Sequence, residues 1–559
     1  MRKTWNVKTG DGEVTKALIK ELSISPILAT LLANRGITTA KEASVFLNSK
    51  LEDLHSPFLF KDMDKAVERI KRALTKNETV LIFGDYDVDG LTATALLATI
   101  FSQMGLTVYT YIPDRLQEGY GLSKKSVSFV KEKKISLVVT VDCGISSFSE
   151  VELLRQMDVD VIITDHHQPL DGRLPDAYAV IDANRKDCTY PFKYLSGVGV
   201  AFKLAEAVCG RFFKEHLDFV CLGTVADVVP LVGENRIFAK NGLGYLHDTG
   251  KIGIRSLIEA SGLSDKKINE THIGYILGPR INSTGRLSSP TTSLKLLLTD
   301  SKSEAQQLAV MLNSENSMRQ TIVEKILREA LLKIEKEVNF KYHRIIVLDG
   351  EGWHQGVIGI VASRVAERFS RPTIIISSTN DICKGSGRSI GNFHLFEAIC
   401  RCKELLCEYG GHKRAAGFSI PRKNIRLFKD MINAIATEDQ DVGDFIPKLD
   451  IDMELGFDML TPELIEELQD LAPFGEENPA PLFLSKNLVL KTNIQQFGKS
   501  NIKVGLCQGN IIHEAIGFGL LEHMPSLVKN DRVDLVYQPV INNFRNEKTL
   551  QLIIKDIHY

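Results

Sequence analysis

Residues 79–90 of the chain read TVLIFGDYDVDG. An aliphatic run leads directly into three aspartates at alternate positions, Asp85, Asp87 and Asp89. Glycines flank these aspartates, and glycine permits the tight backbone that would bring the carboxylates together. A short aliphatic run that ends in such a turn is typical of a strand buried on both faces of a parallel sheet. We therefore expect a strand whose carboxyl end carries a cluster of carboxylates.

Two later segments repeat this pattern. LVVTV runs into Asp142, and VIIT runs into Asp165, His166 and His167. Helix-like segments separate these runs, and such an alternation of strands and helices predicts a parallel sheet covered on both faces. Because ligands bind beyond the carboxyl ends of the strands in such sheets, we expect all three motifs to meet in one crevice.

Carboxylates gathered at one edge of a sheet repel each other. Two unit charges roughly 4 Å apart repel by about 1 kcal/mol in bulk water and by about 4 kcal/mol at an effective dielectric constant of 20. The cluster therefore needs protons, arginine partners or cations. Oxygen ligands with one or two imidazoles suit Mn²⁺ or Mg²⁺, and the absence of cysteine from the cluster argues against a structural zinc ion. The alternative is a solvated acidic loop in which Asp165 only caps the following turn.

The composition is that of a globular protein with several domains. The chain has 559 residues, of which 44% are hydrophobic and 25% are charged, and this length favours three or four domains. Lys+Arg 68 nearly balance Asp+Glu 70, so the net charge of -2 gives no sign of a polyanionic ligand, although a local basic groove is compatible with it. No apolar run is long enough to span a bilayer, and the first residues lack the apolar core of a signal peptide. We expect a cytoplasmic protein without a membrane partner.

The nine cysteines are scattered along the chain, as in proteins of a reducing cytosol. One group, Cys400, Cys402 and Cys407 with His412, could be interpreted as a zinc site. Its first two cysteines are closer together than the usual pair of zinc ligands, and their segment has the pattern of a helix packed through small side chains. We therefore expect a structural role for this group.

The rest of the chain predicts a second α/β lobe and a β-barrel. A second alternation of aliphatic runs and helices spans about residues 344–436. A long helical pattern at 301–338 precedes it, and Ser301 with Glu304 forms a candidate capping box at its start. This helix is predicted to join two lobes, although burial in one lobe remains an alternative. Beyond an acidic, turn-rich segment at 436–444, short alternating strands predict a small barrel.

The strand-end motifs carry a resemblance to a known family. GDYDVDG, DCG and DHH, in this order and on successive strands, resemble the motifs of the DHH phosphoesterase superfamily. GGHKRAAGF, at 410–418, is similar to the motif of the associated DHHA1 domain. Longer motifs resemble those of RecJ exonucleases: IPDRLQEGYGLS at 112–123, LGTVADVVPL at 222–231, GPRINSTGRL at 278–287, GWHQGVIGIVASR at 352–364, KGSGRSI at 384–390 and LAPFGEENPAPLF at 471–483. The resemblance covers nearly the whole chain.

This resemblance implies an α/β fold in which two α/β lobes, a parallel-sheet DHH domain and a DHHA1 domain, are joined by a long helix. An OB-type β-barrel that tracks single-stranded DNA would follow them. The implied domains are a helical preamble at 1–54, the DHH catalytic domain at 55–300, the connecting helix at 301–343, the DHHA1 domain at 344–440 and the OB-type single-strand-binding domain at 445–559.

The resemblance also implies two divalent metal ions, Mn²⁺ or Mg²⁺, that share a carboxylate. Asp142 matches the shared position. Asp85 is expected close by, either as a metal ligand itself or as a residue that contacts the ligands. Some relatives carry histidine where this chain has Phe83, so one ion would rely on oxygen or water instead. The residues that match ligand positions of the family are Asp87, Asp89, Asp142, His166 and Asp227.

The implied activity is 5′→3′ hydrolysis of single-stranded DNA to 5′-mononucleotides, in DNA repair and recombination. Two ions about 3.5–4 Å apart would activate water and neutralise the attacked phosphate. Catalysis is assigned to Asp142 and to His167, which would face the substrate and stabilise charge on the phosphoryl group. The alternative role of His167 is to orient His166.

An exonuclease must also hold the end of the strand. Arginine suits this purpose because its planar fork pairs with two phosphate oxygens at once. The candidates for DNA binding lie in the RecJ-like motifs: Arg115, Arg280, Asn282, Arg286, Ser386, Arg388 and His412. For any one arginine the alternative is a surface ion pair, and for His412 it is a histidine of the core.

Two rival functions share these motifs. A small-molecule phosphodiesterase of the superfamily would need neither the long helix nor the barrel. An inactive DNA-binding scaffold should have lost acidic or histidine ligands, which are intact here. The implied partners are single-stranded DNA with a 5′ end, a single-stranded-DNA-binding protein and a helicase, and the implied state is a monomer.

Overall fold

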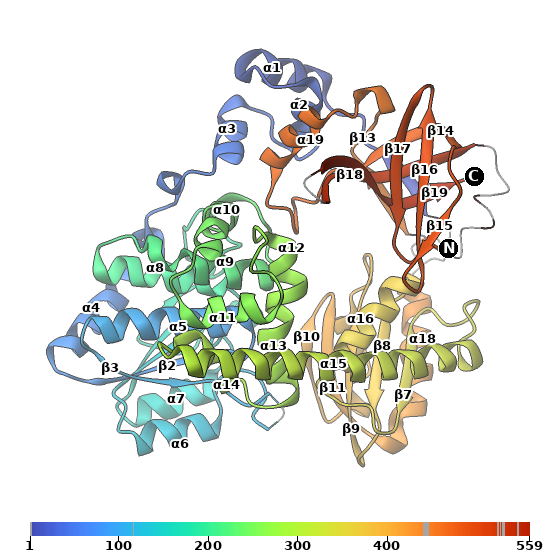
Figure 1. Ribbon diagram of the computed structural model, residues 1–559. Coiled ribbons are helices and arrows are strands. Elements are labelled where there is room, and N and C mark those ends of the chain that lie inside the picture. The colour runs from blue at the N-terminus through green and yellow to red at the C-terminus, as the bar shows by residue number, and fades with distance from the viewer. Residues whose placement is uncertain are drawn as a thin grey trace. The chain divides into compact units, whose positions relative to one another are not determined.

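The structure, a computed structural model, describes residues 3–115, 117–439, 447–521, 525, 527, 532–544 and 547–559. Its contacts divide the chain into two compact units. The first comprises Met1–Thr4, Asn282–Ser289 and Val310–Lys448, and the second comprises Trp5–Ile281, Pro290–Ala309 and Leu449–Tyr559. Each unit contains its own α/β sheet, and the second also contains a β-barrel (Figure 1).

The sheet of the second unit is parallel, with the strand order β3-β2-β4-β5-β6. Gly84 on β2 pairs with Val141 on β4, which pairs with Thr164 on β5. The three strands therefore end at the same level, and the aspartates that follow them lie side by side. The strands are β2 (Thr79–Gly84), β3 (Thr107–Tyr111), β4 (Leu137–Val141), β5 (Asp160–Thr164) and β6 (Ala179–Ile181).

Helices cover both faces of this sheet, which confirms the predicted architecture. Helices α6 (Lys124–Glu132) and α7 (Phe148–Gln156) lie on one face, where side chains such as Phe83 form a buried core. Helices α5 (Val88–Gln103) and α8 (Gly197–Cys209) lie on the other face (Figure 1). Further helices of this part are α4 (Met63–Thr75), α9 (Leu217–Ala226), α10 (Gly233–His247), α11 (Ile252–Ala260), α12 (Glu270–His272), α13 (Gly278–Leu287) and α14 (Thr291–Leu298).

The first unit contains the predicted second α/β lobe. Its sheet has the order β10-β11-β9-β8-β7, in which only the pair β7–β8 is parallel. The predicted acidic segment at 436–444 begins within α18, and its part from 440 onward lies outside the described residues. The elements are β7 (Ile346–Gly350), α16 (Ile358–Phe369), β8 (Thr373–Ser377), β9 (Ile382–Arg388), α17 (Leu395–Arg401), β10 (Glu408–His412), β11 (Ala415–Pro421) and α18 (Ile425–Asp439).

The predicted long helix is α15, Lys302–Glu337. Only half of its predicted capping box forms. The Glu304 N–H donates to Ser301 Oγ at 3.4 Å, but the Glu304 carboxylate accepts from the Thr299 hydroxyl instead of the Ser301 N–H. The Ser301 N–H donates instead to Thr299 Oγ1 at 3.2 Å. The Thr299 hydroxyl thus bridges the Ser301 N–H and the Glu304 carboxylate, which a capping box would join directly.

The C-terminal strands form the predicted barrel. The strand order is β13-β14-β18-β19-β17-β16-β15, and a pairing of β14 with β16 closes it. A short sheet of β1 with β12 lies outside it. The elements are β1 (Thr4–Val7), β12 (Lys448–Ile451), β13 (Met453–Glu454), α19 (Pro462–Leu468), β14 (Phe483–Leu490), β15 (Gln495–Phe497), β16 (Asn501–Gln508), β17 (Ile511–Gly517), β18 (Val533–Phe544) and β19 (Glu547–His558).

The N-terminal helices and the barrel share one hydrophobic core. Leu28 and Leu31 of α2 belong to the same buried cluster as Leu535 and Ile554 of the barrel. Trp5 adds a polar contact, because its indole Nε1 donates to Asp556 Oδ2 at 2.7 Å. The helices are α1 (Gly12–Leu22), α2 (Pro26–Ala33) and α3 (Ala40–Asn48).

Candidate metal centre

The ends of the parallel strands bring the predicted acidic and histidine residues together. Among the described residues, three groups of side chains have potential ligand atoms within 4.8 Å of one another. Asp142 belongs to two of these groups, as a residue shared between two ions would. The groups are Asp142 with His166 and His167, Asp89 with His166 and Asp227, and Asp85 with Asp87 and Asp142.

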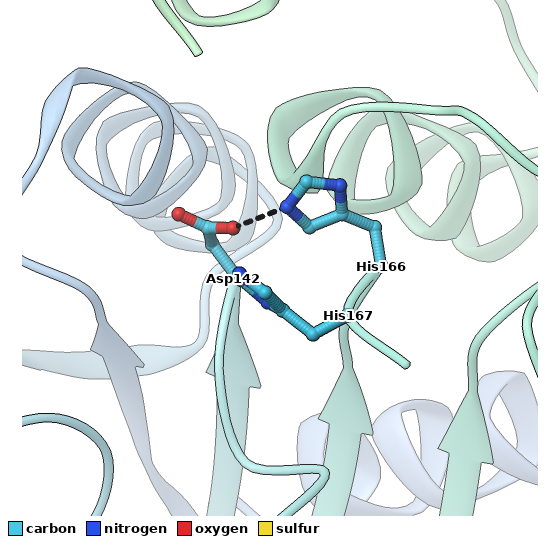
Figure 2. Close-up of side chains that lie close together, drawn as sticks. All are labelled: Asp142, His166 and His167. Carbon is cyan, nitrogen blue, oxygen red and sulfur yellow. Dashed lines mark ion pairs between the residues drawn. The ribbon is translucent and has the colours of Figure 1, made fainter. Parts of the chain in front are cut away.

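At the middle of the centre, Asp142 and His166 face each other without a hydrogen bond. Figure 2 shows the His166 ring turned toward the Asp142 carboxylate, with its Nε2 3.1 Å from Oδ1. His166 Nε2 also lies 3.7 Å from Asp227 Oδ2. Asp85 Oδ1, Asp142 Oδ1 and His166 Nε2 are buried and have no hydrogen-bond partner. Buried polar atoms are seldom left without a partner, so these three atoms fit a bound cation.

The carboxylates of the centre are unfavourable in their charged form. Burial, reinforced by the charges of neighbouring aspartates, raises the pKa of Asp85, Asp142 and Asp227 well above the ordinary value. Burial and the charge of Asp87 raise the pKa of Asp89 to about 7. Divalent cations would relieve this repulsion, and carboxylates with a single imidazole are the donor set that Mn²⁺ or Mg²⁺ accepts.

His166 is poised to offer a lone pair. Burial and the charge of His167 lower the pKa of His166 to about 4, so its ring is neutral at pH 7. The ring is hydrogen-bonded to the backbone of Leu195. Because Nε2 has no hydrogen-bond partner, this bond belongs to Nδ1, which fixes the Nε2 lone pair toward Asp142.

His167 is held in a different state from His166. Burial alone would lower the pKa of His167, but its hydrogen bond with Asp165 and the charge of that carboxylate raise this pKa to about 9. The bond joins His167 Nδ1 to Asp165 Oδ1 at 2.8 Å. Asp165 also accepts from the backbone N–H groups of both histidines. Asp165 therefore organises the turn and keeps a positive imidazole beside the carboxylates.

Sequence reasoning missed Tyr120, which lies against His167. Its hydroxyl donates to the Asp142 carbonyl oxygen at 3.1 Å and lies 3.2 Å from His167 Nδ1. Tyr120 stands in the quoted IPDRLQEGYGLS motif, so the motif itself was the available signal. The tyrosine links the strand end of Asp142 to the His167 ring.

The start of α8 was also missed. Ser196 caps this helix, and the backbone N–H groups of Gly197 and Val198 donate to Asp89 at 2.6 and 2.8 Å. The backbone must approach closely, because a Cβ on Gly197 would lie 2.6 Å from the Asp142 side chain. The helix start thus supplies partial positive charge to the carboxylates. No side-chain type marks such donors in a sequence.

Three other residues named from the sequence take secondary positions in this unit. Phe83 is fully buried in the core of the sheet, so it offers nothing to a metal. The Arg115 guanidinium lies over the Tyr86 ring, 5.1 Å from its centroid, and its charge partly offsets the raised pKa of Asp85. Arg280 donates to the Ile276 carbonyl oxygen at 2.7 Å.

The remaining DNA-binding candidates belong to the first unit. On β9, Arg388 Nη1 lies 3.2 Å from Ser386 Oγ, and a side chain at Gly359 would meet both residues. Both therefore reach the first turn of α16, and a helix start with an arginine and a hydroxyl suits a phosphate group. The other candidates lie on α13, where Arg286 donates to the Gly356 carbonyl oxygen and Asn282 precedes it, and on exposed β10, where His412 lies. Their role in DNA binding stays a prediction.

The raised pKa values predict how the metal-free protein responds to pH. A folded-state pKa raised to about 7 for Asp89 and to about 9 for His167 means that the folded state binds these protons more tightly than the unfolded chain. Stability is therefore lost as pH rises from about 4 to 7 through Asp89, and from about 6.5 to 9 through His167. His166 acts in the opposite sense, but only below about pH 6.5. We expect the melting temperature of the chelator-treated protein to fall between about pH 6.5 and 9.

Calorimetric or fluorescence melts in a chelator would measure this effect. Saturating Mn²⁺ should remove the part of the fall that comes from the carboxylates, because a bound cation favours their deprotonated form. The control is Asp142→Asn, which removes one charge from the cluster and should flatten the profile. A metal-free melting temperature that rises across this range would contradict the proposed charge balance.

Within the described residues, no helix is both long and apolar enough to cross a membrane.

Family models match three parts of the chain. They are the DHH family N-terminal domain at residues 79–224, the DHHA1 domain at residues 338–438 and the RecJ OB domain at residues 451–556. The third match agrees with the closed barrel of the structure and with the predicted OB type.

Whole proteins are similar as well. The chain is 38% identical over 556 residues to the single-stranded-DNA-specific exonuclease RecJ of Bacillus subtilis (strain 168), covering 99% of this chain and 70% of that protein. It is 35% identical to the protein of the same name from Escherichia coli (strain K12), covering 98% of each. Crystal structures of RecJ from Thermus thermophilus with Mn²⁺ and with Mg²⁺ match with TM-scores of 0.85 and 0.79, at 29% and 28% identity. These matches cover 100% of this chain and 79% and 78% of those chains.

Proposed function

The chain belongs to the RecJ family of single-stranded-DNA-specific exonucleases, and from this premise we propose that it degrades single-stranded DNA in the 5′→3′ direction to 5′-mononucleotides. The observation that carries the proposal is the buried pair of Asp142 Oδ1 and His166 Nε2, which face each other at 3.1 Å without a hydrogen bond. An inactive scaffold would have no reason to keep so costly an arrangement. The role that follows from this activity is in DNA repair and recombination.

The residues that would hold two Mn²⁺ or Mg²⁺ ions are the members of the three groups other than His167, namely Asp85, Asp87, Asp89, Asp142, His166 and Asp227. When bound, the ions supply a nucleophile from water near neutral pH and neutralise charge on the attacked phosphate and the leaving oxygen. Asp142 would be shared between them, since it belongs to two groups. Asp85 has a buried oxygen without a partner, which supports a ligand role for it rather than a place behind the ligands.

His167 acts on the substrate rather than on the metal in this proposal. Its Nδ1 is engaged by Asp165, and its pKa of about 9 keeps a proton on the ring at neutral pH. A positively charged imidazole stabilises the extra charge that develops on the phosphoryl oxygens as the bond breaks. Asp165 and Tyr120 orient this ring.

A timed digest of end-labelled single strands tests the proposed polarity. We expect a 3′-labelled strand to shorten progressively while the label stays on the longest remaining product, and blunt duplex to resist. Release of the 3′ label as a mononucleotide at the first time points would overturn the polarity. The absence of hydrolysis with both Mn²⁺ and Mg²⁺ would overturn the proposed activity.

The grip on the terminal phosphate is assigned to Arg115, Arg280, Ser386 and Arg388. A hydrogen bond to a charged group contributes about 1.5–3 kcal/mol, or roughly 10- to 100-fold in rate or affinity. We therefore expect Arg388→Ala to lower kcat/KM about 10- to 100-fold on 5′-phosphorylated strands, and far less on 5′-hydroxyl strands. Initial rates on the two substrates, at several Mn²⁺ concentrations, would measure the difference.

Arg422→Ala is the matched control, because Arg422 is a half-exposed arginine in the same unit, paired with Glu351. It should leave the ratio between the two substrates unchanged. An equal loss on both substrates in Arg388→Ala would show that Arg388 does not recognise the terminal phosphate.

The remaining assignments rest on the family resemblance. We propose that Asn282, Arg286 and His412 contact the DNA backbone and that the OB-type barrel tracks the single strand. The proposed setting is a cytoplasmic monomer that works with a single-stranded-DNA-binding protein and a helicase. The proposed domain limits are those given at 54, 300, 343 and 440.

A further inference from the structure

Val228 stands next to the metal centre with a strained backbone. It directly follows Asp227, and its φ is 62°. A β-branched side chain crowds its own backbone in this left-handed region, so a valine there is an outlier. In the described part of the chain, every other non-glycine residue with positive φ is polar or charged and unbranched at Cβ. Helices that end on a left-handed residue, as α9 does here, normally place glycine or asparagine at that position.

Packing does not explain the valine. Val228 is 66% exposed, so its methyl groups add little to the protein core. The other strained residue of the centre, Asp142 with φ 61°, carries a carboxylate that the metal site uses. Val228 therefore combines an unfavourable backbone with a side chain that is offered to solvent, and neither feature stabilises the folded protein.

The element that packs against the end of α9 also carries an exposed aromatic side chain. The π-helical turn Ile273–Leu277 carries Tyr275, which is 81% exposed. This turn packs against the end of α9, because a Cβ on Gly278 would lie 3.4 Å from the Ala226 Cβ. Short π-helical segments are rare and occur frequently at functional sites. Val228 after α9 and Tyr275 on the neighbouring turn are thus both exposed, on two elements that pack together.

We propose that Val228 contacts the DNA strand beside the metal centre, by packing its isopropyl group on the sugar or base of the nucleotide being removed. An apolar group gains nothing from the phosphate, whereas the deoxyribose and the face of the base present apolar surface. The contact explains why valine is kept where glycine or asparagine would be more stable. The inference rests on the proposed nuclease activity and adds a substrate-contacting residue to it.

Two variants separate the side chain from the strain. Val228→Ala removes two methyl groups and keeps a Cβ on the left-handed backbone, whereas Val228→Asn relieves the strain and replaces the apolar group by an amide. We expect both to raise KM for single-stranded DNA by about 10-fold, the effect of losing most of one buried valine contact. kcat should change by less than about 3-fold in both variants, because the contact stabilises the bound substrate and the transition state equally. Val228→Asn should raise the melting temperature more than Val228→Ala, because asparagine tolerates the left-handed region better than alanine does.

Lys134→Asn is the matched control. Lys134 is another exposed residue with positive φ, 52°, on a loop after α6, and it takes no part in the proposed site. The same replacement there should raise the melting temperature without changing KM. An unchanged KM in both Val228 variants would overturn the proposal. So would a loss that disappears at high Mn²⁺ concentration, because Val228 would then act by positioning Asp227.

Substrates that lack the 5′-terminal base identify the group touched. If the wild type and Val228→Ala have similar KM values on abasic ends, the valine contacts the base; if the difference of about 10-fold persists, it contacts the sugar. The wild-type digest is the separate test of the nuclease activity, so a failure of this inference cannot be confused with a failure of that proposal.

Discussion

Asp142→Ala is expected to lower single-strand hydrolysis by at least about a thousandfold, since a bridging metal ligand supports several kcal/mol of transition-state stabilisation. The variant should still fold and bind single-stranded DNA, because the proposed strand contacts lie on other residues. Asp142 is 1% exposed, and its Oδ1 lacks a hydrogen-bond partner. The fold therefore does not depend on this carboxylate oxygen.

The same variant should be more stable than the wild type in a chelator. Burial and the neighbouring aspartates make the charged Asp142 carboxylate unfavourable, so its removal relieves repulsion when no cation is bound. Initial rates with Mn²⁺, strand binding and melts in a chelator would measure the three effects. Asp176→Ala, at an acid whose side chain is 82% exposed, is the control and should change none of them. Near-normal turnover of Asp142→Ala would refute the two-metal assignment.

Arg236→Met should destabilise the protein by about 3–5 kcal/mol, the cost of stripping several buried polar groups of their partner. Arg236 is 1% exposed, and its guanidinium stacks 3.8 Å from the centroid of the Phe46 ring. All its hydrogen bonds go to backbone carbonyls, those of Phe46, Asp470, Leu471, Ala472 and Pro473. Burial without a carboxylate partner lowers its pKa to about 9.

Methionine would fill the volume of Arg236 but leave these carbonyls without donors. Denaturant unfolding of both proteins at equal Mn²⁺ concentration would measure the loss. Arg155→Met is the control, because Arg155 is 58% exposed in a surface ion pair and such pairs contribute about 0–1 kcal/mol. A difference between the two variants of less than about 1 kcal/mol would mean that the carbonyls find water in place of Arg236.

The sequence predicted the sheet of the metal centre well because its strands are buried aliphatic runs. The aliphatic run LVVTV coincides with the observed strand Leu137–Val141, and the run that begins at Thr79 is a strand as far as Gly84. The short β6 and the edge strand β3 were missed, since a run of three residues, or a partly exposed run of five (TVYTY), gives a weak signal. The residue types and their order at the strand ends were enough to indicate the metal chemistry.

What the sequence could not predict depends on backbone geometry and on distant packing. The donors at Gly197 and Val198 are backbone N–H groups, which every residue but proline carries. The positive φ of Val228 likewise could not be predicted, because valine rarely adopts this backbone conformation. A helical preamble at 1–54 was predicted, but that prediction does not say which surface covers the apolar side of its helices. The domain limit at 54 says nothing of the core that these helices share with the barrel.

Because α2 and the barrel share one core, the apolar side chains of α2 stay uncovered for much of translation. Trp5 and its hydrogen-bond partner Asp556 are 551 positions apart. The apolar side chains of the first helices are likewise buried by barrel strands that are synthesised late. At about 5–20 residues per second, these helices spend roughly half a minute to two minutes without their partner strands. Domains that fold in order of synthesis usually bury their first segments early. Here the helices α1 to α3 are synthesised long before the barrel strands that bury their apolar side chains, so these side chains stay uncovered until those strands leave the ribosome.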